Sequence, residues 1–225
     1  MTTVLAAYDA LVAAGQNTKP KTSVAQFPTV TAFGQVLGET QTVARREMWI
    51  HDVRSGTLTP VDIHPGEGVG KAMLNDRLEA AVETVHGDEH RALLYRDGRV
   101  TEVAGVQGST ANILNDFNNM GWVLGSSVVD AGGRTQYESF LDVPGEGSFA
   151  LRSLIDPANL AGWSDIGATW LNDRGDIAGA GLHEGTLRLF VLTNAQVPMV
   201  PEPATAWLAL TGLALLARRR GSRGE

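Results

Sequence analysis

The sequence contains no cysteine. This absence excludes a disulfide framework, a thiolate nucleophile and a thiolate metal site. Lysine is also scarce, with only Lys19, Lys21 and Lys71, and the formal net charge is -7. Residues 218–225 carry a net charge of +3, so the rest of the chain carries -10. A body this acidic disfavours nucleic acid as a partner, and we expect none.

A hydrophobic run of full membrane-spanning length is missing from the C-terminal tail. The uncharged residues 204–217 would extend about 21 Å as a helix, against a bilayer core of roughly 30 Å. Upstream, residues 198–203 hold helix-breaking prolines and a carboxylate, so the helix is expected to begin near Pro203. The arginines that follow the run should lie on the cytoplasmic side. We predict a short transmembrane helix with a cytoplasmic C-terminus, and keep an ordinary buried C-terminal helix as the alternative.

The tail has three features in a fixed order. Val200, Pro201, Glu202 and Pro203 come first, the apolar residues 204–217 follow, and Arg218, Arg219 and Arg220 end the series. This order resembles the PEP-CTERM sorting signal of Gram-negative bacteria. The resemblance implies that residues 197–225 are read and cut by an exosortase, a membrane-embedded protease or transpeptidase. It also implies export of the body, transient anchoring through residues 204–217, and an exopolysaccharide-producing source.

The N-terminal residues MTTVLAAYDALVAAGQ do not match a signal peptide. They have no basic n-region, and Asp9 interrupts the apolar stretch. Leu5, Tyr8, Leu11 and Val12 have helical spacing instead. We therefore expect residues 1–28 to be a helical or leader segment, and the printed chain to begin inside a longer precursor.

A repeat of about 44 residues occupies the body. Three copies begin with LNDRLEAAVE (74–83), FNNMGWVLGS (117–126) and LNDRGDIAGA (171–180), and VTAFGQVLGE (30–39) is a weaker fourth. Their starts lie 44, 43 and 54 residues apart, and the longest gap contains the insertion at residues 143–148. Regular recurrence of this kind predicts a repeat architecture.

Each strong copy carries an asparagine that can form an Asx turn: Asn75, Asn118 and Asn172. Gly121 and Gly175 follow three positions after two of these asparagines and permit a positive φ. The copy at residues 74–83 has Leu78 at the glycine position, and the weak copy has Gly34 without the asparagine. These two turns are therefore expected to differ from the others.

A second shared element follows each copy. Residues 47–61, 90–103, 138–151 and 187–194 are rich in β-branched and aromatic residues, and the first three contain a glycine turn. This pattern is typical of a strand, a tight turn and another strand. We predict an all-β fold over residues 29–196, a propeller-like array of about four units followed by the short C-terminal helix. The last unit lacks a final strand, which an N-terminal segment could supply. An open β-sandwich or an irregular β-solenoid remains an alternative.

The repeat also resembles the HAF-type extracellular repeat, with Leu171 to Gly179 matching its first half and His90 to Tyr95 its second. The resemblance implies a secreted, propeller-like β domain with no established catalytic activity.

Candidate chemical groups are few. His86 and His90 in HGDEH could bind a metal. Their expected position in a hairpin argues against the helix that would align the two rings, so we expect no metal site there. GEGVGKA (66–72) lacks the leading glycine and final hydroxyl of a phosphate loop, so we interpret it as a flexible loop between units. Asp173 and Asp176 are interpreted as turn formers rather than calcium ligands. We assign no catalytic residue, no metal site and no cofactor.

The tryptophans are the last candidates in the body. Trp49, Trp122, Trp163 and Trp170 are expected to fill the spaces between units, although one at a rim could stack on a sugar. The sequence thus favours an exported, non-enzymatic protein of the cell envelope or extracellular matrix, with a structural or carbohydrate-adhesion role and exopolysaccharide as a partner. An envelope hydrolase and an uncleaved membrane-anchored protein are the alternatives.

Overall fold

The computed structural model describes residues 31, 35–41, 46–52, 54–62 and 68–193. The predicted N-terminal segment at residues 1–28 and the sorting signal at residues 197–225 lie outside these ranges, so both stay predictions. No helix in the described part of the chain has the length and apolar character needed to cross a membrane.

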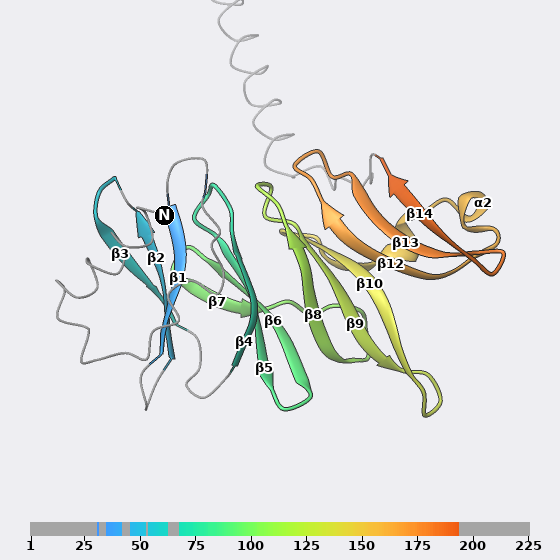
Figure 1. Ribbon diagram of the computed structural model, residues 1–225, viewed down its shortest axis with the longest axis horizontal. Helices are drawn as coiled ribbons and strands as arrows, with labels where there is room; N and C mark the ends of the chain where they lie inside the picture. The colour runs from blue at the N-terminus through green and yellow to red at the C-terminus, as the bar shows by residue number, and fades with distance from the viewer. Residues whose placement is uncertain (1–30, 32–34, 42–45, 53, 63–67, 194–225) are drawn as a thin grey trace, which may run out of the picture. The chain divides into compact units, whose positions relative to one another are not determined.

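The described chain is all-β, as predicted, and forms four antiparallel sheets whose strands follow chain order (Figure 1). We number these sheets 1 to 4. Sheet 1 contains β1 (Gln35–Gln41), β2 (Arg46–Asp52) and β3 (Thr57–Val61). Sheet 2 contains β4 (Gly68–Leu74), β5 (Ala80–His86), β6 (Glu89–Arg96) and β7 (Arg99–Glu102). Sheet 3 contains β8 (Ser109–Phe117), β9 (Val123–Asp130), β10 (Thr135–Val143) and β11 (Gly147–Ala150). Sheet 4 contains β12 (Trp163–Leu171), β13 (Ile177–His183) and β14 (Thr186–Leu192).

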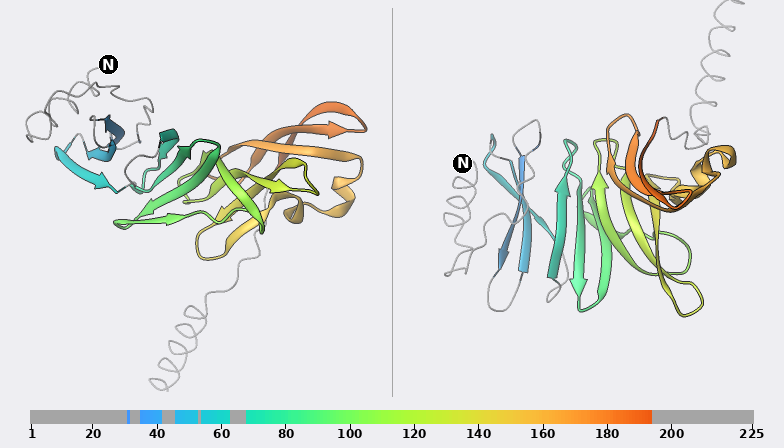
Figure 2. Two further views of the ribbon diagram at one scale, coloured as in Figure 1. Left: turned by 90° about the horizontal axis from the view of Figure 1, so that it is seen from below. Right: turned by 45° about the vertical axis from the view of Figure 1, so that its right-hand side comes forward.

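Each sequence repeat corresponds to one sheet. In sheets 2, 3 and 4 the asparagine turn joins the first two strands, and the strand–turn–strand element supplies those that follow. Sheet 4 ends with β14 and has no fourth strand among the described residues, as the sequence predicts. Figure 2 shows the sheets following one another in the order of the chain.

The long spacing before the last repeat has a different origin from the one expected. Residues 143–148 do not form an insertion, because Val143 pairs with Gly147 in the β10–β11 hairpin. The additional residues lie between β11 and β12, in the 3-10 helix η1 (Leu151–Leu154) and the short helix α2 (Pro157–Leu160). Asp156 caps α2, since its side chain accepts a hydrogen bond from the amide of Ala158 at 2.8 Å.

Sheet 2 packs between sheets 1 and 3, and the first part of its strand β5 is buried on both faces. Alternate residues of a strand point to opposite faces. Ala80 and Val82 of β5 pack in a core shared with sheet 1, and Ala81 between them packs in a core shared with sheet 3. All three side chains are almost fully buried. The apolar start of β5 is thus explained by contacts on both of its faces.

Two hydrophobic cores join the first three sheets. The core between sheets 1 and 2 contains Leu37, Met48, Ile50, Val61, Ala72, Leu74, Ala80, Val82 and Tyr95. The core between sheets 2 and 3 contains Ala81, Ala92, Leu94, Val103, Leu114, Phe117, Val123 and Phe140.

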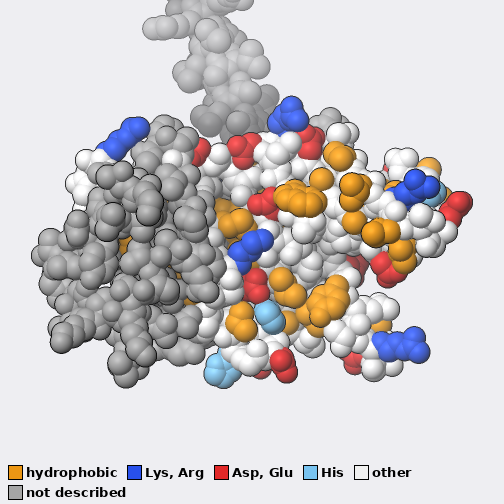
Figure 3. Space-filling view, viewed as in Figure 1, with side chains coloured by type: hydrophobic (Ala, Val, Ile, Leu, Met, Phe, Trp, Pro, Cys, Tyr) orange, Lys and Arg blue, Asp and Glu red, His pale blue; other side chains and the backbone are white. Residues whose placement is uncertain are grey.

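One face of sheet 4 is apolar and exposed. Leu187, Leu189 and Val191 of β14 are opposite Leu182, Ala180 and Ala178 of β13, and Trp170 of β12 is also opposite Ala178. The exposed fractions of Leu189 and Trp170 are 81% and 62%. Figure 3 shows hydrophobic side chains along the part of the surface that sheet 4 occupies.

Candidate functional site

The asparagine turns are the most regular polar feature of the fold. Asn118 Oδ1 accepts hydrogen bonds from the amides of Met120 (3.0 Å) and Trp122 (2.9 Å). Asn75 and Asn172 each accept two amides at the equivalent positions, at 2.9–3.0 Å. The Asx turns predicted at all three asparagines are therefore present.

The turn that begins at Asn75 is not different from the others, contrary to expectation. Leu78 has φ +62°, and Gly121 and Gly175 at the equivalent positions have φ +80°. The amides of Leu78 and Gly121 donate to the carbonyl oxygens of Asn75 and Asn118 at 3.2 and 3.0 Å. Leucine thus adopts the left-handed backbone because the turn around it requires it.

The weak first copy uses threonine in place of asparagine. The amide of Gln35 donates to Thr31 Oγ1 at 3.1 Å, and the amide of Thr31 donates to the carbonyl of Gln35 at 3.0 Å. The Thr31 hydroxyl also donates to Gln35 Oε1. Thr31 is 7% exposed, so its hydroxyl replaces the asparagine as a buried acceptor. Residues 32–34, including Gly34, lie outside the described ranges.

Hydrogen bonds between successive turns join sheets 2, 3 and 4. Asn75 Nδ2 donates to the carbonyl of Asn118 (3.2 Å), and Asn118 Nδ2 donates to the carbonyl of Asn172 (3.0 Å). The following positions form a parallel series, because the amide of Asp76 donates to Asn119 Oδ1 and the amide of Asn119 donates to Asp173 Oδ1, both at 2.8 Å. We call these residues the turn row. Its second series was missed in the sequence, although an Asp or Asn follows the asparagine in all three strong copies.

Buried carboxylates in sheet 2 also have structural partners. Glu79 Oε1 accepts from Arg96 Nε at 2.6 Å, and its other oxygen accepts from Asn75 Nδ2 at 2.7 Å. Glu83 Oε1 lies 2.6 Å from His90 Nδ1, and Glu83 Oε2 accepts from the amide of Leu114 in sheet 3 at 3.3 Å. These acids hold strands together.

The sequence-derived metal candidates have other roles. His86 is opposite Glu89 and His90 is opposite Val85 in the β5–β6 hairpin, so the two histidines point to opposite faces. Asp173 accepts two hydrogen bonds from Asn119 of the neighbouring turn. Asp176 Oδ2 accepts from Asn172 Nδ2 at 2.8 Å. The described residues hold no group of three or more His, Cys, Asp or Glu that could bind a metal ion.

The interpretation of GEGVGKA as a flexible loop is wrong for its described part. Residues 68–72 belong to β4, and Lys71 Nζ donates to the carbonyl of Asn115 on β8 at 2.5 Å. Residues 66–67 lie outside the described ranges.

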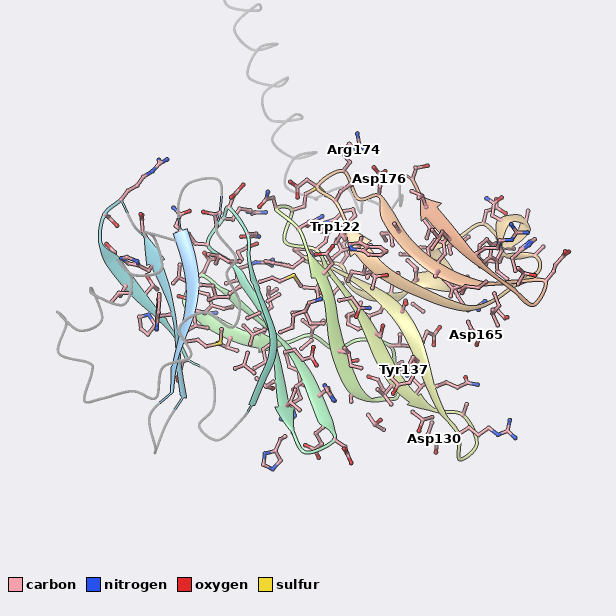
Figure 4. The ribbon with its side chains drawn as sticks, in the orientation of Figure 1. Trp122, Asp130, Tyr137, Asp165, Arg174 and Asp176 are labelled. Atoms are coloured by element: carbon pink, nitrogen blue, oxygen red, sulfur yellow. The ribbon has the colours of Figure 1, made fainter. Side chains whose placement is uncertain are left out.

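The tryptophans have three different environments. Trp49 is 5% exposed, and the Trp122 ring lies against Gly175, where an added Cβ would be 2.8 Å from it. Figure 4 shows Trp122 near the turn that carries Arg174 and Asp176. Trp163 packs on His183 and Phe190 of its own sheet. The exposed Trp170 corrects the expectation that all four fill spaces between sheets.

Trp49 and His51 form a buried polar pair in β2. Their ring centroids are 6.3 Å apart, and among the described residues neither Trp49 Nε1 nor His51 Nδ1 has a hydrogen-bond partner. Burial lowers the pKa of His51, and the adjacent Asp52 carboxylate partly opposes this shift. The pKa of Asp52 is itself lowered, first because the amide of Arg54 donates to its carboxylate.

A groove lies between β10 of sheet 3 and β12 of sheet 4, with a volume of about 650 Å³. We call it the β10–β12 groove. Ser139 forms part of its wall and joins the two sheets, because its hydroxyl accepts from the amide of Ala168 at 3.0 Å. Tyr137, Glu138, Arg152 and Asp165 also line it. Figure 4 shows Tyr137 and Asp165 on the two sides of the opening. A second, more apolar pocket of about 380 Å³ lies beside η1, α2 and Trp163.

Comparison with known proteins assigns the chain to no family. No protein-family model and no curated protein matches the sequence. Solved structures that resemble parts of the fold include TolB from Acinetobacter baumannii, with 13% identity over 75% of this chain and 43% of that one, at a TM-score of 0.44. The β-propeller domain of the Trilobed protease from Pyrococcus furiosus has 12% identity over 70% and 49%, at 0.43. The NanB sialidase from Streptococcus pneumoniae has 14% identity over 70% and 28%, at 0.31. The chain spans less than half the length of each of these structures.

Proposed function

We propose that the protein is an exported component of the cell envelope or extracellular matrix, sorted by its C-terminal signal. The observation that carries this proposal is the fixed order of Val200-Pro201-Glu202-Pro203, the apolar residues 204–217 and Arg218 to Arg220. An apolar run that is short for a bilayer and ends in arginines suits a transient anchor with its C-terminus in the cytoplasm. An exosortase then cuts the tail and releases the body.

The body is a non-enzymatic cargo in this proposal, and its four sheets are the blades of a propeller-like array. A meander of four antiparallel strands that packs face to face with the next is the usual form of a blade. The buried carboxylates Glu79 and Glu83 hold strands together, and Asp173 belongs to the turn row. These three acids therefore have structural roles, which supports a structural or carbohydrate-adhesion function over catalysis.

The sorting step is tested by the intact mass of the mature protein. The full chain, exported behind a secretory signal peptide, is expressed in a Gram-negative host with an exosortase and in the same host without it. We expect a mature chain lacking Arg218 to Arg220 only in the first host. A Pro201→Ala/Glu202→Ala variant should keep its tail, and Pro198→Ala, just outside the motif, should be cut normally. A full-length mass in the exosortase host would overturn the proposal in favour of an uncleaved anchor.

The non-enzymatic role is tested separately with a broad panel of hydrolase substrates. The purified protein should turn over none of them above the rate in buffer. Turnover that is abolished by a single acidic substitution, such as Glu138→Gln in the β10–β12 groove, would identify an envelope hydrolase instead.

A further inference from the structure

The β10–β12 groove exists because two neighbouring elements do not continue along their partners. β11 pairs only with residues 140–143 of β10, so within the described part of the chain no strand pairs with residues 135–139 on that side. On the other wall, β12 loses its regular register with β13 between Ser164 and Gly167. Both walls are thus irregular at the point where the groove opens.

Asp165 lies within that irregular part of β12 and has a strained backbone. Its φ is +48°, in the left-handed region, which is uncommon for residues other than glycine although aspartate adopts it more often than most. Bulges of this kind redirect a side chain and are concentrated next to binding sites. Asp165 lies within strand β12 rather than in a turn. Its exposed carboxylate is on the wall of the groove.

The polar side chains of the groove differ from the other polar clusters of the fold. In the described structure, Arg152 and Asp165 make no side-chain hydrogen bond or ion pair, although they line one cavity. The buried acids Glu79 and Glu83 of sheet 2 and Asp173 of the turn row are paired by comparison. A ligand with many hydroxyl groups could form hydrogen bonds with the side chains of Arg152 and Asp165, which have no partner within the described structure.

An aromatic ring stands beside these groups. Tyr137 is 67% exposed, and it lies two residues before Ser139, so both point to the same face of β10. Since Ser139 contacts the main chain of β12, the Tyr137 ring stands at the rim of the same joint. A rigid, amphipathic ring at the rim of a polar groove can stack on the apolar face of a sugar ring.

The charges favour a neutral ligand over an anionic one. Asp165 and Arg152 offset each other in the groove, and the body around them is strongly acidic. An acidic polysaccharide would be repelled by this field. We propose that the β10–β12 groove binds a neutral oligosaccharide, with Tyr137 as the stacking residue and Arg152 and Asp165 as partners for hydroxyl groups. This inference rests on the adhesion role proposed above and locates it.

The inference is tested by calorimetric titration of the full chain with cellohexaose and maltohexaose as neutral probes and a galacturonic acid hexamer as the anionic probe. We expect binding of at least one neutral probe, and weaker or no binding of the acidic one. Tyr137→Ala should weaken binding roughly tenfold or more, equivalent to about 1.4 kcal/mol. Tyr137→Phe keeps the ring and should stay within about threefold of the parent.

The matched control is Trp170→Ala, which removes another exposed ring of β12 that does not line the groove. It should leave binding unchanged, and thermal unfolding confirms that each variant is folded. Failure of all neutral probes on a glycan array would overturn the groove inference but not the sorting proposal, whose readout is the mass of the tail. Binding that is equal in the parent and in Tyr137→Ala would also overturn it, since main-chain pairing along residues 135–139 of β10 needs no ring.

Discussion

Asn119 and Asp173 are joined by two hydrogen bonds from one turn to the next. The amide of Asn119 donates to Oδ1 of Asp173 at 2.8 Å, and Asn119 Nδ2 donates to Oδ2 at 2.9 Å. Asn119 also accepts the amide of Asp76 and donates to the Asp76 carboxylate. One half-buried side chain thus connects the turns of sheets 2, 3 and 4. The turn row adds directional bonds to the hydrophobic core between sheets 2 and 3, and it also joins sheets 3 and 4.

Asn119→Ala should therefore destabilise the array. The substitution removes the side-chain partner of the Asp76 amide, of the Asp76 carboxylate and of Asp173 Oδ2, and keeps only the main-chain bond to Asp173 Oδ1. We expect the free energy of unfolding to fall by about 1–3 kcal/mol. Urea denaturation followed by tryptophan fluorescence measures this change. Asn159→Ala on α2 is the control, because Asn159 is exposed and no side-chain hydrogen bond of it is observed. Equal stability of the two variants would show that the turn row contributes nothing.

Leu78→Gly should stabilise the protein. Leucine in the left-handed region costs about 1–2 kcal/mol, and glycine removes that cost while adding about 0.4–1 kcal/mol of unfolded-state entropy. The net gain expected is about 0.5 kcal/mol, visible as a higher Tm in a thermal scan. Gly175→Ala is the reciprocal test and should destabilise, because its Cβ would lie 2.8 Å from the Trp122 ring at a φ of +80°. A lower Tm for Leu78→Gly would mean that the contacts of the leucine side chain outweigh its backbone strain.

Local features of the fold could be predicted from the sequence, and features between sheets could not. The Asx turns at Asn75, Asn118 and Asn172 depend on residues within four positions, so their pattern is visible in one copy of the repeat. Thr31 was missed because the repeat pattern was defined by its asparagine, whereas a threonine hydroxyl can accept the same hydrogen bond from the amide four residues later. Leu78 was misjudged because the surrounding turn overrides the preference of a single residue.

The candidate site was beyond sequence reasoning for a physical reason. The β10–β12 groove depends on where β11 stops pairing and on the irregular register at Ser164 and Gly167. Both depend on pairing between strands that are distant in the chain. Tyr137 is one of only three tyrosines in the sequence, and no motif surrounds it. A rim aromatic that could stack on a sugar was foreseen in general terms among the tryptophans, but the residue in the groove is a tyrosine.

The pKa of His51 predicts a pH dependence of stability. Burial lowers the pKa of His51 in the folded protein, whereas in the unfolded chain it stays at its ordinary value of about 6.5. Below that pH the unfolded state therefore binds more protons at His51 than the folded state does. The folded state is therefore relatively less stable as the pH falls through that value, and its stability is fully recovered above it. Denaturant unfolding at pH 7.5 and pH 5 should show the loss.

His51→Asn is the informative variant for that experiment, with His86→Asn on the exposed end of β5 as its control. We expect the first to reduce the difference in stability between pH 7.5 and pH 5 and the second to retain it. The lowered pKa of Asp52 acts in a separate window, below its ordinary value of 3.8, where stability is lost as that carboxylate is protonated. An unchanged pH difference in His51→Asn would assign the effect to other groups.

Two leucine substitutions should separate the packed interior from the exposed face of sheet 4. Leu124 of β9 is 0% exposed and Leu189 of β14 is 81% exposed. Leu124→Ala creates a cavity and should lower the free energy of unfolding by about 2–5 kcal/mol. Leu189→Ala should change it by less than about 0.5 kcal/mol, because its side chain loses little contact on truncation. Urea denaturation of the two variants in parallel measures the difference. A large loss for Leu189→Ala would show that the apolar face of sheet 4 is covered in solution, since only a buried side chain stabilises the fold to that extent.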